Sequence, residues 1–298
     1  MKILLLGKNG QVGWELQRSL APLGDVLALD ARSSDYCGDL NDLQGLAATV
    51  QRFAPNIVVN AAAYTAVDKA ESEPDRALRV NAEAPAVLAA EALKLNALLV
   101  HYSTDYVFAG DGDMPWQETD PVGPLSVYGS TKLAGEQAIQ ASGCFHLIFR
   151  TSWVYAARGN NFAKTILRLA QERDSLNVID DQFGTPTGAD LLADVTAHAI
   201  RSMRQQPQLG GIYHLAAAGE TTWYRYARFV LEQAQAAGIQ LNVAPVSVGA
   251  IATAAYPTPA KRPGNSRLST QKLQNAFSLR LPEWQAGVAR MLIETLEK

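Results

Sequence analysis

The fold is decided by the stretch ILLLGKNGQVG, residues 3–13, near the start of the chain. Its apolar run predicts a short buried strand, and the apolar spacing over residues 12–20 predicts a helix directly after the glycines. In such a turn the first glycine allows the bend, the second lets the backbone approach a ligand, and the third lets helix and strand pack closely. Because a helix amino terminus attracts anions, the pattern indicates a site for the pyrophosphate of a dinucleotide rather than a glycine-rich turn without a ligand. The candidate residues are Gly7, Gly10, Gln11, Val12 and Gly13.

Apolar runs alternate with amphipathic stretches over the first 150 residues. This alternation predicts an α/β fold of Rossmann type, in which a doubly wound parallel sheet is covered by helices on both faces. The expected strands are 3–6, 26–30, 57–61, 97–102 and 145–149, and the expected helices are 12–20, 40–53, 75–95 and 130–141.

The alternation loosens after Thr151, and no Gly/Ser-rich linker marks a boundary there. We therefore expect residues 1–150 to form a dinucleotide-binding domain to which later segments return, and residues 151–298 to form mainly a smaller, interleaved substrate-binding lobe. The expected elements of this half are helices at 162–173, 190–203, 223–236 and 284–296 and a strand at 212–215.

Composition and charge argue against several classes of protein. The chain has 298 residues, of which 48% are hydrophobic, and its 26 basic and 29 acidic residues give a net charge of −3. No basic cluster indicates a nucleic-acid partner, and no apolar run is long enough to span a membrane or to serve as a signal peptide. Cys37 and Cys144 stand far apart, which fits a reducing compartment. We expect a cytoplasmic protein without membrane contact.

Charged residues near the second expected strand bear on the choice of cofactor. Asp30 ends that strand about 20 residues after the glycines, where an acid hydrogen-bonds the adenosine ribose and favours NAD. Arg32 and Lys8 favour the 2′-phosphate of NADP, although either can be a surface cation. Asp39, followed by Leu40, is placed to approach the adenine or, equally, to cap the next helix.

Small residues follow the third expected strand, at 60–65, where backbone passes close to a flat ligand or simply packs tightly. Further candidates for contact with the cofactor are Ala63, Tyr64, Thr65 and Tyr102.

Tyr128 and Lys132 stand four residues apart on an expected helix and thus share one face. Reduction of a ketone needs a proton on oxygen, and a nearby ammonium lowers the pKa of a phenol that donates it. The pair alone is a weak signal. Its weight comes from Thr104, whose hydroxyl follows the fourth expected strand at the edge of the sheet where ligands bind. Thr104 would hydrogen-bond the substrate carbonyl and the tyrosine, although a role in capping a turn is the alternative.

With the glycine turn, Asp30, Thr104 and the Tyr128–Lys132 pair in this order, the chain resembles the extended short-chain dehydrogenase/reductase family. Within that family it is similar to the reductases of dTDP-linked keto sugars over its full length. The stretches that carry the likeness are 60–68, 103–108, 128–132, 150–155 and 181–187.

The resemblance implies transfer of a hydride from NADPH, less often NADH, to C4 of dTDP-6-deoxy-L-lyxo-4-hexulose, which gives dTDP-L-rhamnose. Tyr128 would donate the proton, Lys132 would lower its pKa and hold the nicotinamide ribose, and Thr104 would adjust the tyrosine. Thr104, Asp105 and Trp153 would contact the sugar nucleotide; without the resemblance, Trp153 reads as a core residue.

The resemblance also implies a homodimer with Mg²⁺ bound at its interface. Glu15 matches that pattern, Asp190 stands where a glutamate is usual, and Glu294 is the third candidate. Solvated surface acids are the alternative. The four histidines, His101, His146, His198 and His214, stand singly and receive no role.

Two other functions remain open from the sequence. A sugar-nucleotide 4-epimerase uses the same Tyr–Lys pair with a retained NAD, and a non-catalytic regulatory subunit keeps the fold as a binding module. A 4,6-dehydratase is disfavoured because Tyr106 follows Thr104-Asp105 where that reaction needs a second carboxylate.

Overall fold

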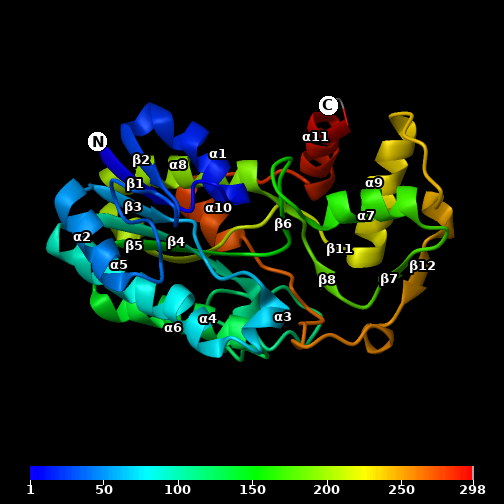
Figure 1. The fold of residues 1–298 in the computed structure, drawn as a ribbon, viewed down its shortest axis with the longest axis horizontal. Coiled ribbons are helices and arrows are strands. Elements are labelled where there is room, and N and C mark those ends of the chain that lie inside the picture. The colour runs from blue at the N-terminus through cyan, green and yellow to red at the C-terminus, as the bar shows by residue number, and fades with distance from the viewer. Residues whose placement is uncertain (297–298) are drawn as a thin grey trace.

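A six-stranded parallel sheet forms the centre of the computed structural model, which describes residues 1–296 (Figure 1). The strands lie in the order β10-β5-β4-β3-β1-β2, so the direction of winding reverses between β1 and β3. Ligands of such sheets bind beyond the carboxyl ends of the strands at this reversal. The strand bounds are β1 (Lys2–Leu6), β2 (Asp25–Leu29), β3 (Ile57–Asn60), β4 (Leu98–Thr104), β5 (His146–Thr151) and β10 (Gly211–His214).

Helices cover both faces of this sheet, as the sequence predicts (Figure 1). Side chains alternate along a strand, so Ile3 and Leu5 belong to the apolar core of one face and Leu4 and Leu6 to that of the other. The first core is closed by α1 (Gln11–Leu20), α8 (Ala189–Gln205) and α10 (Gln271–Phe277). The second core is closed by α2 (Leu43–Phe53), α5 (Ala84–Lys94) and α6 (Val127–Ser142). The predicted fold class is confirmed, and α8, β10 and α10 return to the sheet after residue 151.

The remaining segments form a smaller lobe, on the right in Figure 1, built on two further apolar clusters. Its helices are α7 (Phe162–Glu172), α9 (Trp223–Ala236) and α11 (Trp284–Leu296). Its short strands pair as β6 (Val154–Tyr155) with β9 (Thr187–Gly188), β7 (Asn177–Ile179) with β12 (Gly249–Ile251), and β8 (Phe183–Gly184) with β11 (Thr221–Thr222). Within residues 1–296, no helix is long and apolar enough to cross a membrane.

The structure differs from the sequence prediction in two places that border the candidate site. The single helix expected at 75–95 is α4 (Pro74–Leu78), a π-helical turn η2 (Arg79–Glu83) and then α5. In η2 the Ala84 N–H donates to the Arg79 carbonyl, five residues back. The Asn81 side chain of this turn accepts from the Tyr64 N–H and donates to the Tyr64 carbonyl. Asp42, not Asp39, caps α2, by accepting from the Gly45 N–H at 2.9 Å. The remaining short elements are η1 (Ala21–Leu23), α3 (Val67–Ala70), η3 (Asp105–Val107), η4 (Pro207–Leu209), η5 (Pro245–Ser247) and η6 (Thr253–Ala255).

Candidate active site

The glycine turn between β1 and α1 is packed too tightly for side chains at two of its three glycines. Gly7 has a φ of 89°, and a Cβ on it would lie 2.8 Å from the carbonyl carbon of Ala61. A Cβ on Gly13 would lie 2.0 Å from the Gly7 carbonyl oxygen. Gly10 is different, because its Cβ position meets only that oxygen, at 3.4 Å. No side chain caps α1, so the N–H groups of its first turn are open to an anion.

A cavity of about 260 Å³ lies beside this turn, at the carboxyl ends of β1, β2 and β3. Seven of the predicted cofactor contacts line it: Gly7, Gly10, Asp30, Asp39, Leu40, Ala63 and Tyr64. Of the other candidates, Gln11, Val12 and Gly13 form the first turn of α1, while Arg32, Thr65 and Tyr102 are not among the lining residues. Ala62, another lining residue, falls in the stretch 60–65 that was expected to pass close to a ligand. The sequence did not predict the further lining residues Asn9, Ala31, Gly38, Asn41, Arg76 and Val80.

Asp30 is held at the rim of this cavity by a network of hydrogen bonds. Its carboxylate accepts from the Arg32 N–H at 3.0 Å, from the Ser33 hydroxyl at 3.1 Å and from the Asn9 amide. Burial raises the pKa of Asp30, but the Arg32 and Ser33 hydrogen bonds outweigh it, so the net pKa is below its ordinary value. The Lys8 amine lies 3.4 Å from the Ser33 hydroxyl. Anionic and cationic groups therefore stand side by side at this rim.

Thr104, Asp105 and Tyr128 meet at the carboxyl end of β4. Thr104 ends the strand, donates to the Asp105 carboxylate at 3.1 Å and accepts from the Tyr106 N–H at 3.2 Å, so it also caps the turn η3. Tyr128 lies in the first turn of α6, with its ring edge-on to that of Tyr106 at a centroid distance of 5.5 Å. Burial raises the pKa of Tyr128, and the neighbouring Thr104 hydroxyl lowers it in part. Burial also raises the pKa of Asp105 to about 6, and its Oδ2 atom is buried without a partner among the described residues.

Lys132 points from α6 toward β4 rather than into solvent. The side chain is 1% exposed, and its Nζ atom donates to the Tyr102 carbonyl at 2.6 Å and lies 3.0 Å from His101 Nε2. Burial lowers the pKa of Lys132 to about 8, although Glu136 on the same helix raises it. The Nζ atom is thus bound on the sheet side, and the lowering of the Tyr128 pKa by Lys132 stays a prediction.

Trp153 follows β5, the strand whose Thr151 pairs with Thr104, and has a left-handed φ of 48°. Its indole stacks on Trp223 at a centroid distance of 3.6 Å and an interplanar angle of 16°. On another side a Cβ on Gly184 would lie 2.5 Å from the Trp153 ring. A strained backbone held by packing on both sides is a feature of functional positions.

Comparison with known proteins assigns this architecture. A family model described as "RmlD substrate binding domain" matches residues 1–297. The chain belongs to this RmlD family. It is 61% identical to an Escherichia coli protein named dTDP-4-dehydrorhamnose reductase, over 99% of this chain and 98% of that protein.

Two solved structures named for the same activity share the RmlD fold at full length. A Clostridium acetobutylicum dTDP-4-dehydrorhamnose reductase superposes with a TM-score of 0.88 at 35% identity, over 100% of each chain. A Bacillus anthracis dTDP-4-dehydrorhamnose reductase in complex with NADP superposes with a TM-score of 0.86 at 33% identity, over 99% of each chain.

The acidic residues predicted to bind magnesium do gather, but a guanidinium stands between them. Glu15, Asp190 and Glu294 line a pocket of about 30 Å³ together with Arg290, which lies 3.3 Å from Glu294 and 3.8 Å from Asp190. Glu15 lies 3.5 Å from Arg18. Within residues 1–296, no three His, Cys, Asp or Glu side chains are placed to hold a metal ion. In the single chain these acids are paired with arginines, and the Mg²⁺ site expected at a dimer interface stays a prediction.

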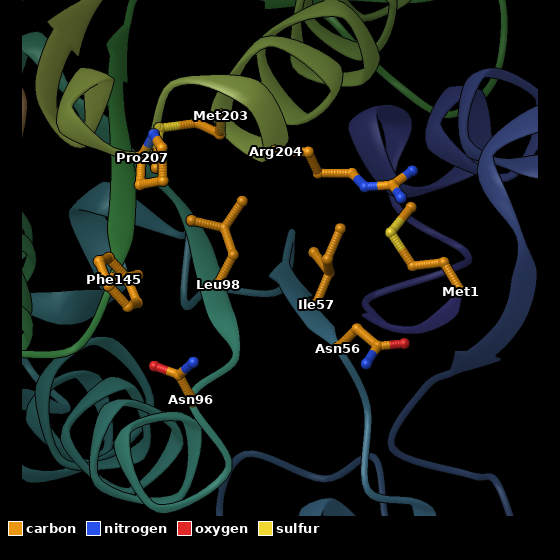
Figure 2. A pocket seen from close by; sticks show the side chains of 9 residues that line it. All are labelled: Met1, Asn56, Ile57, Asn96, Leu98, Phe145, Met203, Arg204 and Pro207. Carbon is orange, nitrogen blue, oxygen red and sulfur yellow. The ribbon is translucent and has the colours of Figure 1, made fainter.

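A larger cavity, of about 580 Å³, lies at the amino ends of the strands, opposite the candidate active site (Figure 2). Ile57 and Leu98 line it from the amino ends of β3 and β4, and Phe145 precedes β5. Mostly apolar side chains surround it, with Arg204 as its cation. Because ligands of parallel sheets bind at the carboxyl ends, its size does not make it the candidate active site.

Two buried polar residues near Lys132 were missed from the sequence. Asn60 and His101 are each 1% exposed, and the Asn60 amide lies 3.2 Å from His101 Nδ1. Each is a polar residue in an otherwise apolar strand, and a buried polar side chain needs a hydrogen-bond partner. This pattern could have marked both residues from the sequence.

Proposed function

We propose that this protein reduces the C4 keto group of dTDP-6-deoxy-L-lyxo-4-hexulose, with NADPH as the reductant, to give dTDP-L-rhamnose. The observation that carries the proposal is the meeting of Thr104, Asp105 and Tyr128 at the carboxyl end of β4, in a sheet whose β1–α1 glycine turn borders a cavity suited to a dinucleotide. The named activity of the full-length relatives supports the choice of substrate.

The residues of the 260 Å³ cavity fit a dinucleotide. The uncapped amino terminus of α1 would hold the pyrophosphate, and Asp30 the adenosine ribose. Lys8 and Arg32 stand near Asp30, which favours the 2′-phosphate of NADPH, and the NADP complex of the Bacillus anthracis relative supports this preference. When bound, the nicotinamide supplies a hydride to the carbonyl carbon.

Tyr128 then supplies the proton for the carbonyl oxygen. Its raised pKa keeps the phenol protonated, as a proton donor must be, and the Thr104 hydroxyl orients it. Once the proton has left, a charged Lys132 stabilises the phenolate. Asp105 is positioned next to Thr104 to accept from a sugar hydroxyl through its unpartnered Oδ2. Trp153 would present an apolar face to the deoxysugar.

An assay with the dTDP-4-keto sugar tests this function. We expect oxidation of NADPH, followed at 340 nm, with formation of one dTDP-L-rhamnose for each NADPH consumed, and a lower kcat/KM with NADH. Absence of oxidation with either cofactor would overturn the proposal. Recovery of a 4-epimerised sugar from enzyme that purifies with NAD bound would then assign the epimerase activity instead.

We further propose that the protein is a homodimer. Two large apolar side chains are exposed beside the acidic pocket residues in sequence, Trp14 at 45% and Ile293 at 56%. Exposed apolar side chains of this size are common at interfaces between subunits. Light scattering after size exclusion should give twice the 32.1 kDa chain mass, and a monomer mass would contradict the assembly.

A further inference from the structure

Three buried polar side chains form a line from β3 through β4 to α6. Asn60, His101 and Lys132 are each 1% exposed, and hydrogen-bond distances join them in sequence: 3.2 Å from Asn60 Nδ2 to His101 Nδ1, and 3.0 Å from His101 Nε2 to Lys132 Nζ. The proposed function uses only Lys132. Burying Asn60 and His101 costs free energy unless their hydrogen bonds are made. Two buried polar residues that the proposed mechanism does not use therefore indicate a further role.

The donors in this line fix the position of the imidazole proton. Asn60 Oδ1 accepts from the Ala62 N–H at 3.2 Å, so the Asn60 amide turns its NH₂ group toward His101. His101 Nδ1 must then accept, and the proton of the neutral imidazole lies on Nε2, facing Lys132. An ammonium has no lone pair to accept that proton. The observed hydrogen bonds are therefore complete only when Lys132 is a neutral amine.

The groups around Lys132 allow it to change charge without His101 becoming charged. Burial and the neighbouring Lys132 hold the pKa of His101 well below its ordinary value. Burial lowers the pKa of Lys132 to about 8, with Glu136 opposing. Glu136 is itself paired with Arg150 of β5 at 2.7 Å, and Tyr128 is the other titratable group on this face of α6. From β3 only the uncharged Asn60 reaches the line.

We propose that His101 is a positioning residue for Lys132, and that its tautomer couples the charge of Lys132 to the loop at residues 60–65 that borders the nucleotide cavity. The proposal rests on the proposed function for the role of Lys132. When Lys132 takes up one proton from solvent, His101 Nε2 gives up its proton and Nδ1 gains one, so the net change is a single proton. The Asn60 amide must then rotate, which releases the Ala62 N–H at the cavity wall.

Two substitutions at His101 should shift the pH dependence in opposite directions. The measurement is kcat/KM for NADPH against pH at saturating sugar, because this parameter reports groups of the enzyme before the cofactor binds. His101→Leu removes an acceptor and disfavours the ammonium form of Lys132. The alkaline limb, which is the fall of kcat/KM at high pH, should therefore move to lower pH by about half a unit or more, and kcat should fall about tenfold. His101→Gln offers a fixed carbonyl acceptor, so the limb should move to higher pH with most of kcat retained.

A second buried histidine provides the matched control. His214 on β10 is 0% exposed and bonds the Trp116 carbonyl at 3.0 Å; it faces Arg150, and none of its hydrogen bonds joins it to Lys132. His214→Gln should leave the alkaline limb in place. Alkaline limbs of both His101 variants that stay at the wild-type pH, or that move in the same direction, would overturn the proposal. If His101→Leu does not fold, the direction of the His101→Gln shift decides.

Nitrogen-15 NMR of labelled histidine tests the coupling without any turnover. Above the pKa of Lys132, the His101 signals should report a proton on Nε2, and below it a proton on Nδ1. Lys132→Met should abolish this change. Signals of His101 that stay constant from pH 6 to 10 would overturn the coupling. Because this readout needs no substrate, it separates failure of the coupling from failure of the proposed function.

Discussion

The predicted catalytic residues and the predicted metal-binding acids each form a cluster, and the two clusters differ in whether charged partners already occupy them. In the enclosed site, defined as the glycine turn with Thr104, Tyr128 and Lys132, the three side chains are largely buried. Thr104 bonds the Asp105 carboxylate, and Lys132 bonds the Tyr102 carbonyl. In the acidic patch, defined as Glu15, Asp190 and Glu294, arginines already balance the carboxylates.

The difference shows what a motif can establish about a site. Both sets of residues gather as expected, but only the enclosed site leaves its groups to be completed by a ligand. In a buried site each substitution leaves an unpaired group or a clash, whereas solvent compensates for changes in an exposed patch. We therefore expect effects to fall steeply from the first cluster to the second.

The largest effect is expected for Tyr128→Phe. This change keeps the ring that packs on Tyr106 but removes the proton donor. We expect kcat to fall by about 10²–10⁴, with the Kd for NADPH within about threefold of the wild type. Stopped-flow turnover and fluorescence titration of NADPH give the two values. Near-normal turnover would remove Tyr128 from the mechanism.

The glycine turn should give the next largest effect. Gly13→Ala places a Cβ 2.0 Å from the Gly7 carbonyl oxygen, so we expect the free energy of unfolding to fall by about 3 kcal/mol. Gly10→Ala is the matched control, since its Cβ has room, and should leave stability near the wild type while weakening NADPH binding. Denaturant unfolding and cofactor titration separate the two. Equal stabilities for both variants would contradict the tight packing of the turn.

Asp105→Asn should lower the activity and raise the free energy of unfolding, and the gain in stability should depend on pH. The folded pKa of Asp105 is about 6 against an ordinary 3.8, so the folded protein holds a proton that the unfolded chain has lost, and stability falls as pH rises from about 4 to 6. Removal of the carboxylate should raise the free energy of unfolding by about 3 kcal/mol at pH 7.5 and leave it nearly unchanged near pH 4.

Asp181→Asn is the opposite control to Asp105→Asn. Hydrogen bonds from Thr253 outweigh burial and lower the pKa of Asp181, so its contribution is present at neutral pH and is lost as pH falls through the folded pKa. This variant should lose stability at pH 7.5 and match the wild type at low pH. Chemical unfolding at pH 4 and 7.5 tests Asp105, and a further point at about pH 2 tests Asp181, whose folded pKa lies below its ordinary value. A stability change of Asp105→Asn that is the same at pH 4 and 7.5 would refute the assignment for Asp105.

The smallest effect is expected at the acidic patch. Arg290 is 68% exposed in its ion pairs, so Arg290→Ala should change stability by less than about 1 kcal/mol. EDTA should leave the Tm and activity of the wild type unchanged, while Mg²⁺ should raise the Tm of Arg290→Ala, because its carboxylates are then unbalanced. A wild-type Tm that drops by several degrees in EDTA would show that the arginine does not replace the metal.

The sequence predicts those parts of the fold and of the site that follow from local residue patterns and from the order of the strands and helices. The strand–helix alternation gave the parallel sheet and both helical layers, and strand ends placed Thr104 beside Tyr128. It failed where distant side chains decide the outcome. The turn η2 coincides with hydrogen bonds from the Asn81 side chain to the distant Tyr64 backbone, and the partners of Lys132 come from β4.

The same limit explains the acidic patch. Arg290 stands four residues before Glu294 on one helix, which is a local pattern, but Asp190 lies 100 residues earlier, and nothing local indicates that the guanidinium also reaches it. Likewise, the stacking of Trp153 on Trp223 joins two segments of the lobe that no local pattern relates.

The most direct test of the central claim, that the enclosed site reduces a ketone on a nucleotide-linked sugar, is transfer of deuterium. NADPH labelled with deuterium at the transferring C4 position of the nicotinamide is incubated with enzyme and the dTDP-4-keto sugar, and the product is analysed by NMR and mass spectrometry. The account predicts one deuterium at C4 of the sugar and a single epimer, dTDP-L-rhamnose. A product without deuterium at C4, or no product, would contradict it.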